Sequence, residues 1–387
     1  MQSGVGLAAP VDAEAPLVRY RPDAYTRSAP HLREPTSLAR MMMLVVAALV
    51  PALLVGLYNT GAQTAAAMTE AGVEALGGWR GGLLQALGID AHASGAVGSI
   101  VVGLSFFLPV LVVAGLTANA WQALFAATRK REPGEGLGVI VLLFAMSLPP
   151  TIALWTVAVG ASVAVVIGRE IFGGTGRNVL NPALVGLAFL YFAYPSALRG
   201  PAVWVPVEGW SGTTELTAAA TSAAGSLAGL HVSWLQAFVG HRPGAFADTS
   251  TLACLLGAAF LLLHRLISWR ILAGALVGLA VTSRVFEWLA AGTLPLADLP
   301  WYWHATLGSF AFGVTFFATD PVTSPATDRA KWIYGALIGF LTILIRVANP
   351  THTEGVLLAI LFGNTAAPLI DHFVVVAHRR KRMRRRG

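Results

Sequence analysis

V-E-G-W-S-G-T-T-E-L (residues 207–216) is the stretch around which the sequence divides, because it lies in the one long polar break between two hydrophobic halves. Apolar runs dominate the chain on both sides of this break. Glycine and hydroxyl side chains in such a break predict an exposed, flexible connection. We therefore expect two apolar halves that hold this segment between them.

The composition indicates an integral membrane protein. Of the 387 residues, 56% are hydrophobic and 12% are charged, and the mean hydropathy is +0.67, so there is too little polar surface to cover a soluble globule. The formal net charge is +7, and residues 379–386 alone supply seven cations. Beside an apolar helix, such a run favours a membrane surface over nucleic acid. The single cysteine, Cys254, excludes an internal disulfide and an Fe–S cluster held by this chain's thiolates alone.

Apolar windows predict an all-α membrane protein with ten spans. The expected segments are 41–58, 97–127, 137–151, 153–171, 180–195, 250–264, 271–290, 305–319, 332–348 and 355–377. The third and fifth are shorter than the roughly 20 residues of a perpendicular span. They carry Pro149, Pro150 and Pro182, so we expect broken or re-entrant helices there.

The distribution of positive charge predicts that both termini are cytoplasmic. With this orientation, 21 of the 26 Lys and Arg residues lie inside, in the N-terminal extension, four loops and the tail. The other five are Arg80, Arg199, Arg242, Arg284 and Arg346. The polar break then faces the periplasm, and a duplication of five spans would be inverted in the membrane. The expected parts are an extension 1–40, a first half 41–195, an external loop 196–249, a second half 250–378 and a basic tail 379–387.

The polar break contains a motif for covalent modification. Glu208-x-x-Ser211-Gly212-Thr213-Thr214 resembles the acidic-x-x-(Ser/Thr)-Gly-Ala-Thr signature at which a flavin transferase attaches FMN through a phosphoester to the last threonine, here Thr214. Such a hydroxyl must be reachable by another enzyme, which a surface loop with Gly212 allows. Glu208 replaces the usual aspartate, and Thr213 replaces the usual alanine and is a competing hydroxyl. Taken alone, the same residues also fit an ordinary polar turn.

A second unusual stretch lies at the expected membrane depth. Gly173-Gly174-Thr175-Gly176-Arg177-Asn178 is followed by Asn181-Pro182, where a helix is expected to start. Exposed backbone N–H groups, the Arg177 cation and the helix start could together cradle a phosphate or the edge of a flavin ring. A tight cytoplasmic turn explains the same residues. The stretch matches no Walker or dinucleotide pattern.

Two acids near the ends of predicted spans are candidates for a cation path or a proton relay. Asp320 follows the eighth apolar segment, and Asp371 lies within the last one. An ionised carboxylate at such a depth is costly unless it is paired or hydrated. Snorkelling, or a pair with Lys331 or Arg379, is the alternative.

Further polar residues stand at the predicted outer ends of helices. Asp248-Thr249-Ser250 predicts an N-cap before the sixth segment and could also contact a cofactor. Glu354 predicts a favourable charge at the start of the tenth. The histidines show no metal-binding spacing.

Four separated stretches together resemble one family over nearly the whole chain. They are SAPHLR (28–33), GGTGRNVLNPALVGLAFLYFAYP (173–195), the Thr214 loop, and 318–371 with its ATDPVTSP, WIYGALIG, LIRVANP and APLID strings. They resemble the NqrB/RnfD family: the NqrB subunit of the Na⁺-translocating NADH:quinone oxidoreductase and, more distantly, the RnfD subunit of the Rnf ferredoxin:NAD⁺ oxidoreductase. AFLYFAYP and YGALIG favour the quinone reductase, whereas Thr323-Ser324-Pro325 looks more like Rnf.

The resemblance implies a ten-helix, transporter-like fold of two inverted five-helix halves in the bacterial inner membrane. It implies covalent FMN on Thr214, with Ser211 and Gly212 read by the transferase, and a non-covalent riboflavin. Electrons would arrive from a partner's covalent FMN outside and leave to a quinone near the cytoplasmic side, coupled to Na⁺ export along Asp320 and Asp371. The remaining candidate cofactor contacts are Glu208, Thr213, Arg177, Asn178, Asn181, Asp248 and Thr249, and the candidate quinone region is Gly134, Glu135 and Gly136.

The implied partners are the other membrane and flavoprotein subunits of a six-subunit complex, the flavin transferase and membrane lipid. Because the chain has no nucleotide-binding motif, it is expected not to oxidise NADH alone. Two alternatives stay open. An Rnf-type subunit would serve ferredoxin and NAD⁺ without a quinone, and a channel or carrier with the architecture of ammonium or urea channels would leave the Ser-Gly-Thr-Thr loop inert.

Overall fold

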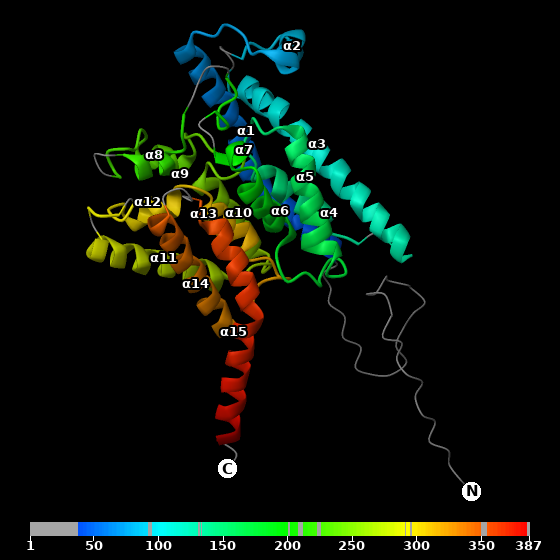
Figure 1. Ribbon diagram of the computed structural model, residues 1–387, viewed down its shortest axis with the longest axis vertical. Helices are drawn as coiled ribbons and strands as arrows, with labels where there is room; N and C mark the ends of the chain where they lie inside the picture. Colours follow the sequence, from blue (N-terminus) through cyan, green and yellow to red (C-terminus); the bar gives the residue numbers. More distant parts are fainter. Residues whose placement is uncertain are drawn as a thin grey trace. The chain divides into compact units, whose positions relative to one another are not determined.

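The computed structural model of the chain is helical, with no β-strand, in the part that it describes (Figure 1). The described residues are 38–91, 95–130, 132, 134–199, 202–207, 212–222, 226–290, 292–294, 296–349 and 354–384. The expected extension 1–40 therefore lies almost wholly outside the described residues, as does its SAPHLR string.

Five helices are long and apolar enough to cross a membrane. They are α1 (Leu38–Ala71), α3 (Ala96–Arg129), α11 (Trp269–Ala290), α14 (Asp328–Ala348) and α15 (Val356–Arg384). Three shorter apolar helices are α4 (Leu137–Met146), α6 (Pro182–Ala193) and α10 (Thr251–Leu263). Two further segments contain π-helical turns: α5 (Leu154–Val165) with η1 (Val166–Glu170), and α12 (Trp301–Thr306) and α13 (Phe310–Phe312) with η2 (Gly313–Phe317). The connections contain α2 (Gly78–Ala86), α7 (Pro195–Arg199), α8 (Glu215–Thr221) and α9 (Trp234–Val239).

Each predicted apolar segment coincides with helical structure, but two are shaped differently from the prediction. The segment 305–319 is not one helix, because the chain between α12 and α13 leaves helical geometry at Gly308, whose φ is +67°. The segment 137–151 ends as a helix at Met146, before Pro149 and Pro150, which cannot continue it. The expected short helix near Pro182 is confirmed as α6, with proline in its first turn.

Glycines allow α11 and α14 to lie side by side (Figure 1). Gly274 and Gly278 on α11 face Gly335 and Gly339 on α14, and a Cβ added at any of the four would overlap backbone atoms of the opposite helix. This is a pair of small-xxx-small motifs. In a membrane, lipid tails are as apolar as leucine, so close packing of this kind is what holds two helices together.

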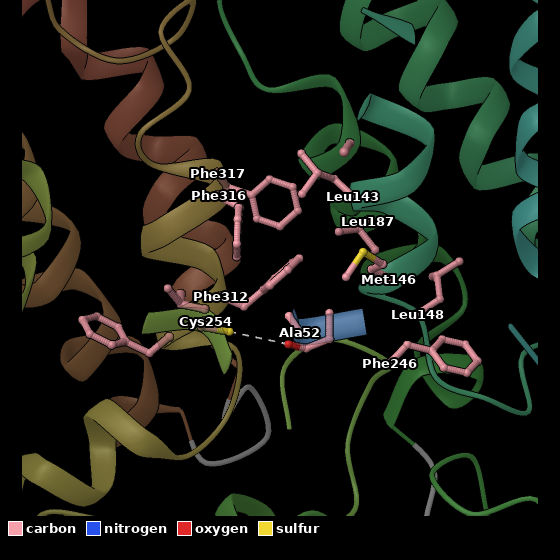
Figure 2. Packing of buried hydrophobic residues seen from close by; sticks show 14 of the residues in the cluster. Ala52, Leu143, Met146, Leu148, Leu187, Phe246, Cys254, Phe312, Phe316 and Phe317 are labelled. Carbon is pink, nitrogen blue, oxygen red and sulfur yellow. Dashed lines mark hydrogen bonds between the residues drawn. The ribbon is translucent and has the colours of Figure 1, made fainter. Parts of the chain in front are cut away.

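Short helices from both halves of the chain meet in a packed interior (Figure 2). The Ala247 backbone N–H, just before α10, donates to the Met146 carbonyl at the end of α4 (3.0 Å). Phe246 packs edge to face on Phe107 with ring centroids 5.0 Å apart. The buried Cys254 thiol donates to the Ala247 carbonyl at 3.7 Å. Non-helical backbone at this depth is tolerated because it is buried in protein and hydrogen-bonded there.

Candidate functional site

Arg169 joins two loops that lie far apart in the sequence, the loop before α4 and the loop after η1. Its Nη2 donates to the Gly134 carbonyl (3.1 Å) and to the Thr175 hydroxyl (2.7 Å). Thr175 in turn donates to the Glu135 carbonyl at 2.7 Å. The arginine is 1% exposed, and its charge is met by Glu170 at 3.2 Å. The predicted quinone region at Gly134–Gly136 therefore lies against the predicted flavin cradle at 173–178.

The loop after η1 presents open backbone. Gly173, Gly174 and Gly176 have φ values of +104°, +103° and +86°. A Cβ at Gly174 or Gly176 would meet nothing within 4 Å, so their peptide groups are accessible to a ligand. The Arg177 side chain is exposed. Asn178 is buried, and its amide donates to the Leu180 carbonyl at 3.1 Å. These residues fit both a cradle for an anionic or flavin group and a turn.

Asp320 and Asn181, which are 139 positions apart, meet at one place. The Asn181 amide donates to the Asp320 carboxylate (3.2 Å), and its oxygen caps α6 by accepting from the Ala183 N–H at 3.1 Å. The Thr323 hydroxyl and the Val322 N–H also donate to the carboxylate, at 3.3 and 3.1 Å. We call Asn181, Asp320 and Thr323 the Asp320 site. Within the described residues, no ion pair involves this carboxylate.

Asp371, the other predicted cation-path acid, lies elsewhere, on α15. Its carboxylate accepts from the Ala326 and Thr327 N–H groups (2.6 and 3.0 Å) and from the Thr327 hydroxyl (2.6 Å). Thr327 is the N-cap of α14. Asp371 therefore anchors the start of α14, and no hydrogen bond in the described chain joins it to Asp320. Its expected pair with Lys331 or Arg379 is not among the ion pairs of the described residues.

Buried arginines organise the other end of the helices. Arg242 (1% exposed) donates to the Thr249 carbonyl from Nε (3.0 Å) and to the Asp248 carbonyl from Nη2 (2.6 Å). Arg346 (0% exposed) donates to the His304 carbonyl at 2.6 Å and to a neighbouring carbonyl after α12 at 3.0 Å. The two arginines satisfy carbonyl groups where the broken segment around α12 leaves them without helical partners.

Two carboxylates balance these arginines. The Glu354 carboxylate accepts from the Ser309 N–H (2.9 Å) and hydroxyl (2.8 Å), and the same hydroxyl lies 3.4 Å from the Asp248 carboxylate. We call Arg242, Asp248, Ser309, Arg346 and Glu354 the arginine cluster. The predicted N-cap before α10 is confirmed, because Ser250 accepts from the Ala253 N–H at 3.1 Å.

The position of Asp248, in the segment before α10, changes its acidity. Burial raises the pKa of its carboxyl group, and the nearby Glu354 carboxylate adds to the rise. Arg242 and hydrogen bonds act in the opposite direction. The Ser309 hydroxyl has one hydrogen for two carboxyl groups, so a proton on one of them completes the hydrogen bonding.

Thr214 is placed differently from the prediction of an exposed hydroxyl. It is 4% exposed and stands at the N-cap of α8, whereas Thr213 is exposed. Its hydroxyl caps no backbone N–H and lies 3.0 Å from the Thr217 hydroxyl. Gly212 precedes it and is half-buried, and Glu208 and Ser211 lie outside the described residues. Within the described chain, no hydrogen bond joins Thr214 to Asp248 or Thr249.

Sequence patterns do not single out the three buried arginines Arg169, Arg242 and Arg346. Arg169 and Arg346 lie inside apolar windows predicted as spans, and a charge at such a position is the signal that marks a functional or structural site. Arg242 lies in a polar loop, where no local pattern distinguishes it.

Comparison with known proteins places this geometry in a family. The model of the family described as NQR2, RnfD, RnfE matches residues 25–379. The chain belongs to this family. Three relatives in the NQR2, RnfD, RnfE family are each named as the subunit lettered B of the Na⁺-translocating NADH-quinone reductase. The one from Pseudomonas aeruginosa (strain LESB58) is 46% identical over 371 residues, which cover 95% of this chain and 92% of the relative.

The other two relatives are similar along the same length. The Azotobacter vinelandii protein is 47% identical, with coverage of 95% of this chain and 91% of the relative. The Klebsiella pneumoniae (strain 342) protein is 44% identical, with coverage of 97% and 94%. The resemblance predicted from the separated strings is confirmed at the level of the NQR2, RnfD, RnfE family, and the matched residues include both loops around Arg169, the Asp320 site and the arginine cluster.

Proposed function

We propose that this chain is the NqrB subunit of a Na⁺-translocating NADH:quinone oxidoreductase of the bacterial inner membrane, a redox-driven sodium pump. The observation that carries the proposal is the similarity to relatives named for that enzyme along 95% of the chain. Because the sequence has no nucleotide-binding motif, oxidation of NADH falls to partner subunits of a six-subunit complex. The chain alone is then inactive towards NADH.

The proposed topology is ten passes in two inverted halves, with both termini cytoplasmic. Contacts between helix ends support it. The start of α4 lies beside the end of η1 through the bond between Gly134 and Arg169. The end of α14 lies beside α12 through Arg346, and Asp371, midway along α15, lies at the start of α14. Each contact is what consecutive apolar segments running in opposite directions would make.

Thr214 is the proposed attachment site of FMN, in the external loop. Its residues fit the group, because the Thr214 hydroxyl caps no backbone N–H, so its conversion to an ester would not remove a helix cap. Thr217 would remain as a hydroxyl donor beside the ester oxygen. A flavin bound there supplies the capacity to accept and release electrons. The loop places it where a partner subunit outside the membrane can reach it.

The two loops around Arg169 are the proposed riboflavin and quinone region. The open peptide groups at Gly174 and Gly176, with Arg177 and Asn178, would hold the polar edge of a flavin. Arg169 fixes the Gly134 carbonyl against this loop. A quinone at the Gly134–Gly136 loop would thus lie within short electron-transfer range of that flavin.

The Asp320 site is the proposed intramembrane cation site. Its carboxylate is held by neutral donors from both halves of the chain, and the described residues give it no cationic partner. A carboxylate without a compensating cation favours Na⁺ at the same place. Asp371, which stands at the start of α14, is the proposed second acid of the path.

Flavin attachment and quinone reduction test the proposal together. The wild-type chain, Thr214→Val and the control Thr217→Val are each produced with the other subunits and the flavin transferase, and denatured gels are inspected for flavin fluorescence. We expect fluorescent bands for the wild type and Thr217→Val, a dark band for Thr214→Val, and Na⁺-dependent quinone reduction only with the fluorescent chains. A dark wild-type band, with the transferase active on another target, would favour the channel or carrier alternative.

One observation favours a second candidate within the same family. Thr323-Ser324-Pro325, at the Asp320 site, looks more like an Rnf-type subunit (RnfD), which would serve ferredoxin and NAD⁺. The complex purified with this chain separates the two functions. Reduction of quinone by NADH supports the quinone-reductase subunit, and reduction of NAD⁺ by ferredoxin without a quinone supports the Rnf type.

A further inference from the structure

The modification motif is closed in the folded chain, although its acceptor must meet a second enzyme. Thr214 is 4% exposed, Glu215 is 4% exposed and Leu216 is 0% exposed. The neighbouring hydroxyl, Thr213, is exposed. The folded segment thus offers the transferase the wrong threonine and hides the one that the motif designates.

Contacts along α8 hold the segment closed. The buried Glu215 carboxylate accepts from the His231 backbone N–H at 2.8 Å, and the His231 ring nitrogen Nδ1 lies 3.7 Å from the same carboxylate. Gly229 lies directly on the helix, since a Cβ there would come within 2.6 Å of the Ala218 carbonyl oxygen. The segment 226–231 is itself fixed, because Ser226 accepts from the Leu296 N–H at 3.1 Å. We call this packing of α8 on residues 226–231 the docked state.

Ester formation needs more room than the docked state gives. FMN is a phosphate monoester without a good leaving group, so the donor must be an activated flavin nucleotide such as FAD. The Thr214 oxygen attacks the flavin-side phosphorus, the pyrophosphate P–O bond breaks, AMP leaves with the electron pair, and the hydroxyl proton passes to a base of the transferase. The attack requires an open approach to the Thr214 oxygen opposite the leaving AMP, but that oxygen is buried beside Thr217.

We propose that the transferase modifies Thr214 only while α8 is undocked, so flavin attachment precedes docking of α8 onto residues 226–231. This inference rests on the proposed function of Thr214. It assigns Glu215 and Leu216 the role of a latch that closes over the finished site. It also explains how Thr213, exposed in the docked state, escapes modification, because in the extended segment the transferase selects the position by the spacing from Glu208.

The order can be tested on the full-length chain, purified in lipid nanodiscs from cells that lack the transferase. Transferase and FAD are added, and covalent flavin fluorescence is followed with time for the wild type, Leu216→Ala and Glu215→Gln. The control is Thr221→Ala, an exposed position on the same helix. Because the apolar anchor of α8 is lost, we expect Leu216→Ala to be labelled about tenfold or more faster than the wild type, Glu215→Gln to be intermediate, and Thr221→Ala to match the wild type.

Two accompanying measurements separate the possible failures. Hydrogen exchange of the 214–221 amides should be faster in Leu216→Ala and unchanged in the long helices, which shows that α8 is released in a folded chain. Wild-type chain co-expressed with the transferase should be fully labelled. Labelling of the purified wild type as fast as Leu216→Ala, or on Thr213, would overturn the order proposed here while leaving flavin attachment intact. No label on any chain, co-expressed chain included, would remove the proposed function itself.

Discussion

The arginine cluster and the Asp320 site both hold carboxylates inside the protein, but the charge is treated differently at each. In the arginine cluster, Arg242 and Arg346 accompany Asp248 and Glu354, and backbone carbonyls occupy the remaining donors of the arginines. At the Asp320 site, amide, hydroxyl and backbone N–H groups surround one carboxylate, and no ion pair involves it in the described chain.

The difference separates a structural site from a transport site. A charge-balanced network gains little from another ion, and removing one of its members leaves an opposite charge buried and uncompensated. A lone carboxylate held by neutral donors keeps its orientation while its charge stays available to a cation. Mutations at the arginine cluster should therefore be felt in stability, and those at the Asp320 site in ion-coupled turnover.

The largest effect is expected from Arg346→Met. The change leaves Glu354 without its nearby cation and two carbonyls without their donor, so we expect a loss of about 3–5 kcal/mol in the free energy of unfolding. Unfolding in mixed detergent micelles measures it. The matched control is Arg284→Met, at an exposed arginine paired with Glu287 three residues on, where the loss should stay below about 1 kcal/mol. Equal losses for the two variants would contradict the structural role of the arginine cluster.

Asp248 gives the arginine cluster a pH dependence. Its folded-state pKa is raised by burial and by Glu354 above the unfolded value of about 3.9. The protonated form is thus favoured by folding, so this contribution to stability is complete below about pH 4 and is lost as the pH rises through the folded pKa. Each unit of pKa difference contributes about 1.4 kcal/mol. Asp248→Asn should flatten the stability profile between pH 4 and the folded pKa, and an unchanged slope would argue against a protonated Asp248.

Asp320→Asn tests the other side of the comparison. The amide keeps the shape and part of the hydrogen bonding, so the stability loss should be about 1 kcal/mol. Without the negative charge, the Na⁺ concentration for half-maximal quinone reduction should rise about tenfold, equivalent to about 1.4 kcal/mol. The measurement is a Na⁺ titration of the assembled complex, with Asp320→Glu as the charge-preserving control. A normal titration for Asp320→Asn would exclude the Asp320 site from the cation path.

The smallest effect is expected where Arg169 touches the quinone-region loop. A Cβ at Gly134 would lie 2.9 Å from the Arg169 Nη2, so Gly134→Ala should push the arginine away from both loops. We expect the KM for quinone to rise about threefold with little change in kcat, as for a loss of uniform binding. Gly138→Ala is the control, because a Cβ there meets nothing within 4 Å. Equal kinetics for both variants would remove this loop from the quinone region.

Local sequence patterns predicted the helices well. Apolar windows located them, and Asn181-Pro182 and Ser250 marked two helix starts that the hydrogen bonds confirm. The break around Gly308 was missed, because a hydropathy window averages over the few residues where the chain leaves helical geometry. The glycine pairs of α11 and α14 have meaning only once the two helices face each other.

The candidate sites were predicted in part. Asp320 and Asn181 were selected separately for their own local reasons, and their meeting depends on contacts across 139 positions. The Arg242 side chain reaches the Thr306 carbonyl, 64 positions away, so its burial cannot be read from a polar loop. Thr214 was expected to be exposed, because a modification motif implies access, and its burial depends on how α8 packs on residues 226–231.

Fragment-ion mass analysis of the denatured chain, co-expressed with the flavin transferase, is the most direct test that this protein carries a covalent flavin. The account predicts one FMN phosphoester on Thr214 and none on Thr213, with both threonines unmodified in chain made without the transferase. FMN on Thr213 would contradict both the spacing of the motif and the order of docking, and an unmodified chain in the presence of active transferase would contradict the redox role proposed here.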